Sequence, residues 1–152
     1  MPSIELMNMI PAQADKCFEL SLSVEAHTES MNGSGERIIG GVSSGSMRLG
    51  DVVTWRARHF GIPFTMTSQI TEYEAPHRFV DEQVAGPFRR WWHEHRFEPV
   101  ADGTRMIDVV EFDSPVGPLG QLANRLVLTR YMTRLLRDRN RWLVEKLSTR
   151  GS

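Results

Sequence analysis

The regular spacing of turn signals between residues 36 and 113 is the feature that most restricts the fold of this chain. Segments rich in glycine and proline divide the region into short runs, and none of the runs has a helical period. Such runs predict consecutive strands of an antiparallel meander, because parallel strands would need helical crossovers between them. The separating segments are 45–50, 61–63, 75–77, 86–87 and 101–103.

Helical patterns flank this strand region on both sides. A first strand over 4–10 precedes a helical stretch over 11–31, which forms one bent helix or two short ones. An apolar stripe predicts a long helix over about 119–147, with a bend near residue 126. We expect one α+β domain over residues 1–150, in which a curved antiparallel sheet of about seven strands wraps around the C-terminal helix.

Alternation along the strands assigns one face of each strand to the interior. These inner faces are largely apolar, but they also carry histidines and an aspartate. Their residues are Val53, Trp55, Ala57, His59, Phe64, Met66, Ser68, Ile70, Trp91, His93, His95, Phe97, Met106, Asp108, Val110 and Phe112. A straight helix cannot follow a strongly twisted sheet along its length. The two are therefore expected to enclose a volume that side chains or a ligand must fill.

Several short motifs make the chain similar to a known superfamily. They are Ile10-Pro11-Ala12 before a helix containing Phe18, residues 50–59, 79–83, 86–88 and 93–97, Gly103-Thr104, Asp108 and Pro115. With the closing helix they resemble the START/Bet v 1-like (SRPBCC) superfamily, in its polyketide cyclase/dehydrase or coenzyme Q-binding START branch. The resemblance implies a helix-grip fold with an internal hydrophobic cavity. Members bind lipids, hormones, polyketides or quinones, and only some are enzymes, so the ligand is not defined.

The resemblance favours an open core over the packed core that any domain needs. On this reading the inner faces and the long helix supply the ligand-binding residues. These are Trp55, His59, Phe64, Met66, Ile70, Phe79, Asp81, Trp91, His93, His95, Phe97, Met106, Asp108, Phe112, Leu128, Met132 and Leu135. We expect His27 and the turn over 31–35 near the mouth of the cavity.

His95 and Asp108 form the strongest candidate for a catalytic pair. A short hairpin at 101–103 places Asp108 opposite His95 or one step diagonal to it. A carboxylate beside an imidazole raises its pKa and orients its tautomer, as a general base requires. The alternative is a buried pair whose members only satisfy each other's hydrogen bonds.

Other chemistries have weaker support, and we predict neither a metal nor a cofactor. His93 and His95 share a face, but a third metal ligand would have to be His59 or Asp108. The glycine-rich segment 40–50 is not followed by the lysine of a phosphate-binding loop, and no Gly-x-Ser-x-Gly motif marks a serine hydrolase. Cys17 lies on an apolar helix face and is predicted to be a packed thiol.

The net charge of −1 is an average over unlike segments. Residues 1–76 carry −4, residues 77–117 carry −3, and residues 118–152 carry +6. In the last segment one row of arginines lies opposite the apolar stripe. It consists of Arg130, Arg134, Arg137 and Arg141. We expect a solvated face with salt links to the acidic body; the alternative is contact with an anionic membrane.

The remaining expectations concern the compartment and partners. A single cysteine and the lack of an 18-residue apolar run predict a cytoplasmic protein. The near-neutral net charge argues against nucleic acid, and we expect a monomer or homodimer that binds a hydrophobic small molecule.

Three functions remain open. The first is carriage or sequestration of a hydrophobic molecule, which predicts an almost wholly apolar cavity. The second is a cyclase- or dehydratase-like enzyme using His95 and Asp108, which predicts convergent polar groups deep in the cavity. The third is a protein-interaction module, which predicts a collapsed core.

Overall fold

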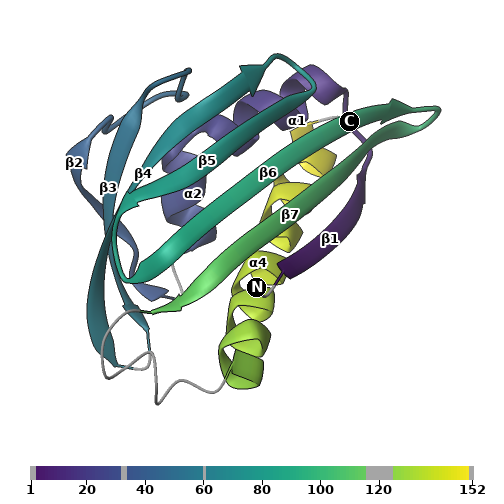
Figure 1. The fold of residues 1–152 in the computed structure, drawn as a ribbon. Helices are drawn as coiled ribbons and strands as arrows, with labels where there is room; N and C mark the ends of the chain where they lie inside the picture. Colours follow the sequence, from purple (N-terminus) through teal and green to yellow (C-terminus); the bar gives the residue numbers. More distant parts are fainter. Residues whose placement is uncertain (1–2, 32–33, 60, 116–124, 151–152) are drawn as a thin grey trace.

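The computed structural model describes residues 3–31, 34–59, 61–115 and 125–150. Helices α1, α2 and α4 all lie on one face of a seven-stranded sheet (Figure 1). The strands are β1 (Ser3–Ile10), β2 (Arg37–Gly41), β3 (Val52–His59), β4 (Ile62–Glu74), β5 (Arg78–Ala85), β6 (Phe88–Val100) and β7 (Gly103–Pro115). The helices are α1 (Ala14–Leu22), α2 (Val24–Ser30) and α4 (Arg125–Arg150).

The sheet confirms the predicted antiparallel meander. Strands β2 to β6 each pair with the next strand along the chain, and the full order is β1-β7-β6-β5-β4-β3-β2. The first strand closes the sheet at its far edge, where Ile4 pairs with Val110 and Ile10 with Thr104. This arrangement is the predicted α+β helix-grip fold, with two short helices after the first strand.

The turn between β6 and β7 packs closely against the backbone at the end of β1. Gly103 has a φ of +148°, and a Cβ there would lie 2.0 Å from the carbonyl oxygen of Ile10. Only glycine therefore allows this close approach. The next residue, Thr104, donates its hydroxyl to the carbonyl of Ala12 at 2.7 Å. The hairpin is thus tied to the segment that leads into α1.

The helical stretch over 11–31 divides into two helices at Ser23. The hydroxyl of Ser23 accepts a hydrogen bond from the amide of Ala26 at 3.1 Å, which caps α2. Phe18 of α1 packs edge-on against Tyr73, Phe79 and Phe97, with ring centroids 5.4–5.7 Å apart. These contacts hold α1 over β4, β5 and β6 at one end of the sheet.

The C-terminal helix α4 crosses the concave face of the sheet (Figure 1). The helical residues expected before Arg125 lie outside the described residues, and α4 begins at Arg125, beside the bend expected near residue 126. Within the described part, no helix is both long enough and apolar enough to cross a membrane.

The inner faces predicted from alternation are confirmed by burial. Val53, Phe97, Met106, Val110 and Phe112 are at most 1% exposed. They belong to two apolar clusters, one around α1 and the C-terminal part of α4, the other around Trp91 and the N-terminal part of α4. The space that these clusters leave on the concave face is where the functional site lies.

A candidate ligand cavity with a polar floor

A cavity of about 540 Å³ lies between the concave face of the sheet and helices α2 and α4. Its walls are formed mainly by aromatic, methionine and leucine side chains from β3, β4, β6 and α4. The exposed apolar residues Ile62 and Val127 also line it, so the cavity reaches the surface beside them. The helix therefore spans the sheet without filling the volume beneath it, as the twist argument predicts.

Thirteen of the predicted ligand-binding residues line this cavity. They are Trp55, His59, Phe64, Met66, Ile70, Phe79, Asp81, Trp91, His93, His95, Leu128, Met132 and Leu135. The other four do not. Phe97, Met106 and Phe112 are packed into the two apolar clusters, and Asp108 lies behind His93. Alternation correctly placed these four residues on the inner face. It could not show that other side chains pack over them and separate them from the cavity.

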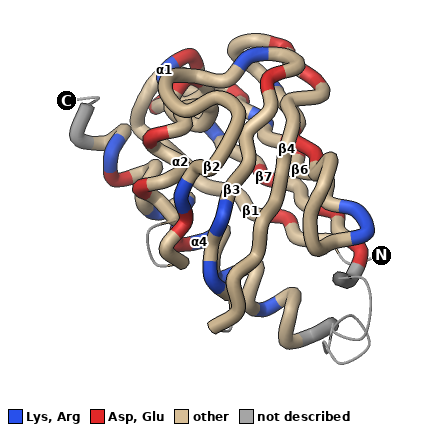
Figure 2. The backbone as a smooth tube through the Cα atoms, turned by 90° about the vertical axis from the view of Figure 1, so that its left-hand side faces the viewer, with Lys and Arg blue, Asp and Glu red and all other residues tan. Residues whose placement is uncertain are grey.

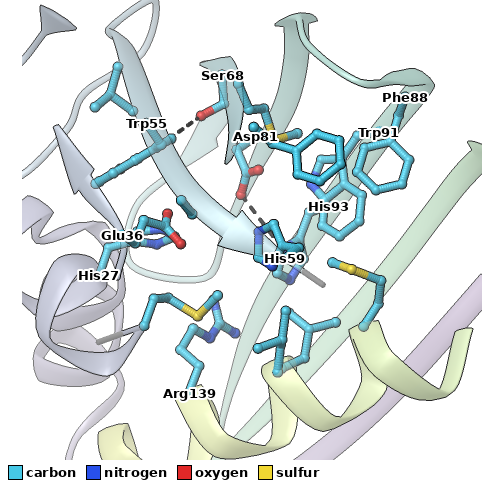
Figure 3. A pocket seen from close by; sticks show the side chains of 18 of the residues that line it. His27, Glu36, Trp55, His59, Ser68, Asp81, Phe88, Trp91, His93 and Arg139 are labelled. Atoms are coloured by element: carbon cyan, nitrogen blue, oxygen red, sulfur yellow. Dashed lines mark hydrogen bonds and ion pairs between the residues drawn. The ribbon is translucent and has the colours of Figure 1, made fainter. Parts of the chain in front are cut away.

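Other lining residues are absent from the predicted set. They include Ser21, Glu36, Met47, Ser68, Phe88, Tyr131, Leu136 and Arg139. His27, expected near the mouth, lines the cavity, hydrogen-bonds to Glu36 and packs on Trp55 with ring centroids 4.1 Å apart. The indole of Trp55 donates to the hydroxyl of Ser68 at 3.3 Å (Figure 3). Residues 32 and 33 of the expected mouth turn lie outside the described residues.

A layer of buried polar side chains separates the two apolar clusters and forms the floor of the cavity. On β6, His93 and His95 lie between Trp91 and Phe97. At the same level, Asp108 lies between Met106 and Val110 on β7, and Arg139 and Asn140 lie between Leu136 and Leu143 on α4. All five polar side chains are at most 6% exposed. Three elements thus contribute to one polar layer within an apolar core.

The two histidines bond to carboxylates in a pattern that differs from the predicted pair. The register places His95 opposite Asp108, as expected, and Asp81 opposite His93. The hydrogen bonds run diagonally instead, from Nε2 of His93 to Asp108 at 2.8 Å and from Nε2 of His95 to Asp81 at 2.7 Å. Nδ1 of His95 lies 3.4 Å from Asp108 and makes no hydrogen bond. His95 and Asp108 are therefore neighbours, as predicted, but each histidine forms its hydrogen bond with the diagonal carboxylate.

Arg139 explains how Asp108 remains charged in the core. Its Nη2 lies 2.6 Å from Oδ1 of Asp108, and Asn140 donates to Oδ2 at 2.8 Å. Burial alone would raise the pKa of Asp108, but Arg139 and His93 outweigh this effect and hold the pKa well below its usual range. Arg139 lies on the apolar arc of α4, where the periodicity of the helix offers no reason for an arginine. Its partner on β7 is that reason.

The cavity side of the floor presents a carboxylate and neutral imidazole. The expected rise in the pKa of His95 is wrong: burial, together with the neighbouring His93, outweighs the carboxylates and lowers the pKa to about 4. Burial would raise the pKa of Asp81, but its hydrogen bond from His95 and the nearby histidines lower it overall. Figure 3 shows Asp81 and His93 pointing toward one another, with Arg139 reaching toward them from α4. The floor can therefore accept hydrogen bonds or protons from a bound molecule.

A second polar contact joins the sheet to α4 elsewhere in the cavity. Nδ1 of His59 and the hydroxyl of Tyr131 are 2.7 Å apart. Burial lowers the pKa of His59 and raises the pKa of Tyr131, so both groups favour their neutral forms at neutral pH. This bond fixes the distance between β3 and α4 near the cavity.

The arginine row on α4 is a solvated face. Arg130, Arg134, Arg137 and Arg141 are all exposed, and basic positions recur along the helix in Figure 2. The salt links expected to the acidic body are not found: none of the four forms an ion pair with an acidic residue in the described part of the chain. Solvent is the main partner of these side chains in the isolated chain.

The fold and the cavity together define a class of protein. A long C-terminal helix held across a curved antiparallel sheet, with an apolar cavity between them, is the helix-grip arrangement of START and Bet v 1-like proteins. This is a fold that binds hydrophobic ligands.

Comparison with known proteins identifies the family. The family described as "Polyketide cyclase / dehydrase and lipid transport" matches residues 1–148, and the chain belongs to it. A search of curated proteins found no match.

Solved structures show the same fold at low sequence identity. A protein from Thermus thermophilus, TTHA0849, is similar with a TM-score of 0.79 and 17% identity, covering 99% of this chain and 100% of that one. A START superfamily protein from Mycobacterium smegmatis has a TM-score of 0.73 and 10% identity, covering 97% of each chain. Ginseng major latex-like protein 151 from Panax ginseng has a TM-score of 0.65 and 13% identity, covering 96% of this chain and 97% of that one.

Proposed function

We propose that this protein binds a hydrophobic small molecule, such as a lipid, quinone or polyketide, and carries or sequesters it in the cavity. The observation that carries the proposal is the volume of about 540 Å³ behind largely apolar walls. Small-molecule sites usually have volumes of about 300–1,000 Å³ and apolar linings. Met31, Met47, Met66 and Met132 line the cavity, and flexible thioether side chains adapt to varied apolar shapes. A protein-interaction module with a collapsed core would have no use for this volume.

The polar floor gives the bound molecule an orientation. The walls suit an apolar body, whereas the Asp81 carboxylate offers a hydrogen-bond acceptor at one end. A few convergent polar groups in an apolar pocket are the usual source of ligand orientation. The ligand we propose is therefore amphipathic, with a hydroxyl or similar hydrogen-bond donor at the floor.

The same floor favours a second candidate function, a cyclase- or dehydratase-like enzyme. Convergent polar groups deep in the cavity are what such an enzyme needs for proton transfer, whereas a carrier uses them only to orient its ligand. Proton transfer would use the pairs His93–Asp108 and His95–Asp81, in place of the pair predicted from the sequence. Incubation with a polyketide distinguishes the two functions: an enzyme converts the polyketide to a new product, whereas a carrier releases it unchanged.

Exchange of the ligand at an anionic membrane is part of the proposal. The exposed apolar side chains of Ile62 and Val127 lie at the cavity surface, and Arg130 is one helical turn beyond Val127. Basic residues contribute about 1 kcal/mol each near an anionic surface. We expect more protein to co-sediment with anionic vesicles than with neutral ones; equal binding to both would contradict this contact.

Thermal unfolding with a ligand panel tests the proposed binding function. Fatty acids, quinones and polyketides are each added to the purified protein, and the midpoint of unfolding is measured. A ligand present at about 100 times its Kd adds about 2.7 kcal/mol of stability, so the class that binds should raise the midpoint by several degrees. If no member of the three classes shifts the midpoint, the proposed function is contradicted.

A further inference from the structure

We propose that Asp81, His93 and His95 form a binding site for one divalent transition-metal ion at the floor of the cavity. One potential ligand atom from each residue lies within 4.8 Å of the other two. All three residues line the cavity. Imidazole nitrogen and carboxylate oxygen together suit Zn²⁺ and neighbouring first-row ions. The inference does not depend on which apolar molecule fills the cavity.

The separations between the ligand atoms fit one shared ion. Oδ2 of Asp81 lies 2.7 Å from Nε2 of His95 and 3.8 Å from Nδ1 of His93. Ligand atoms bound to one ion at about 2.1 Å lie about 3.0–3.4 Å apart. Small movements therefore bring both nitrogens and the oxygen around one ion. The ion takes the place of the proton between His95 and Asp81, and the proton on the neutral His95 ring moves from Nε2 to Nδ1.

The two imidazole rings must turn for both to bind. They are stacked with centroids 3.7 Å apart and planes tilted by 22°, so their in-plane lone pairs run nearly side by side. The χ2 torsion of histidine is soft, and rotation about it directs the lone pairs toward a common point. The cavity lies on the open side of the rings, and the Asp81 side chain, 23% exposed, can follow the ion.

The atoms behind the proposed ligands form the support that metal-binding histidines usually have. Such histidines commonly give their second ring nitrogen to a carboxylate. Nε2 of His93 already bonds to Oδ1 of Asp108, while the buried Nδ1 of His95 lies 3.4 Å from the same oxygen without a partner. A small ring movement on metal binding would let Nδ1 of His95 donate a hydrogen bond to Oδ1 of Asp108. Arg139 and Asn140 hold Asp108 in place for both rings.

The charge of the floor also favours a cation. When both imidazoles are neutral, as metal ligands must be, Asp81 and Asp108 carry two negative charges against the single positive charge of Arg139. A dication beside Asp81 compensates the remaining negative charge in a water-poor site. Coordination positions on the cavity side would face an oxygen of the bound amphipathic molecule.

Titration of chelator-treated protein with Co²⁺, followed by displacement with Zn²⁺, tests this site. We expect one Co²⁺ per chain, a visible absorption band typical of nitrogen and oxygen ligands, and loss of the band when Zn²⁺ is added. Asp81→Asn and His95→Gln should each weaken binding at least tenfold. His77→Gln, which changes an exposed histidine in the turn between β4 and β5, should leave binding unchanged.

Two results would overturn the proposal. The first is wild-type protein that binds no stoichiometric ion, a result that does not depend on whether any variant folds. The second is binding that persists at full affinity in folded Asp81→Asn, because the ion must then lie elsewhere. The ligand panel is measured separately in the presence of chelator, so a failed metal site and a failed cavity function are distinguishable.

Discussion

Replacing Arg139 with methionine should lower the free energy of unfolding by about 3–5 kcal/mol, the usual result of removing one partner of a buried ion pair. Methionine keeps the apolar stem of the side chain, so the effect comes from the charge and its hydrogen bonds. Without Arg139, Asp108 keeps Asn140 and His93 as partners but loses its opposite charge at 2.6 Å. Urea unfolding, followed by tryptophan fluorescence, measures the loss.

Two further variants show whether the loss comes from the ion pair. Arg137→Met changes an exposed arginine on the same helix and should alter stability by no more than about 0.5 kcal/mol. The double variant Arg139→Met/Asp108→Asn leaves no unpaired charge, so its loss should be smaller than the sum of the two single losses. Additive losses, or a loss below about 1 kcal/mol for Arg139→Met, would show that the two charges do not interact as described.

Replacing Ala57 with tryptophan should weaken binding of the apolar ligand at least tenfold, because the indole would occupy the ligand's volume. Ala57 lies on the inner face of β3, pairs with Phe64 of β4 and lines the cavity. Filling an existing cavity does not require the core to expand, so the variant should fold with near-native stability. Arg56→Trp places the same side chain on the outer face of the same strand and should leave binding unchanged. Equal affinities for Ala57→Trp and wild type would place the ligand outside the cavity.

The buried polar layer is difficult to explain by stability alone. Two carboxylates, an arginine and two imidazoles lie between apolar clusters, where packed hydrophobic residues would often be as stabilising. Local departures from the rules of core packing commonly occur at functional sites. The layer is also adjacent to the cavity, since His93, His95, Asp81 and Arg139 line it. We therefore interpret the layer as the chemically specific part of the site.

The strand faces were predictable because alternation along a strand is a local property. Alternate residues from Val53 to His59 on β3 and from Phe64 to Ile70 on β4 point inward as expected. The hairpin at 101–103 correctly set His95 opposite Asp108. The hydrogen-bond partners were not predictable in the same way. Register defines which residues are neighbours, but side-chain torsions decide whether a bond runs straight across or diagonally. His93 bonds to Asp108 and His95 bonds to Asp81, the diagonal carboxylate in each case.

Contacts between the sheet and the helices were beyond what the sequence pattern could predict. Nothing in the spacing of α4 relates Arg139 to Asp108, 31 residues earlier, or Tyr131 to His59, 72 residues earlier. No motif or periodicity in the sequence marked Glu36 as a site residue, although it lines the cavity beside His27. The one available signal was Arg139 itself: an arginine on the apolar arc of a helix needs a buried partner, but the spacing does not identify which residue that partner is.

Native mass spectrometry of wild-type protein and Ala57→Trp, each incubated with a mixture of fatty acids, quinones and polyketides, tests the central claim most directly. After buffer exchange, wild-type protein should retain one small molecule per 17.4 kDa chain, and Ala57→Trp should appear mainly at the mass of the chain alone. The ligand identified in this way then defines the chemical class. Wild-type protein that retains nothing from the mixture, or retains only as much as Ala57→Trp, would contradict the account of a ligand-binding cavity.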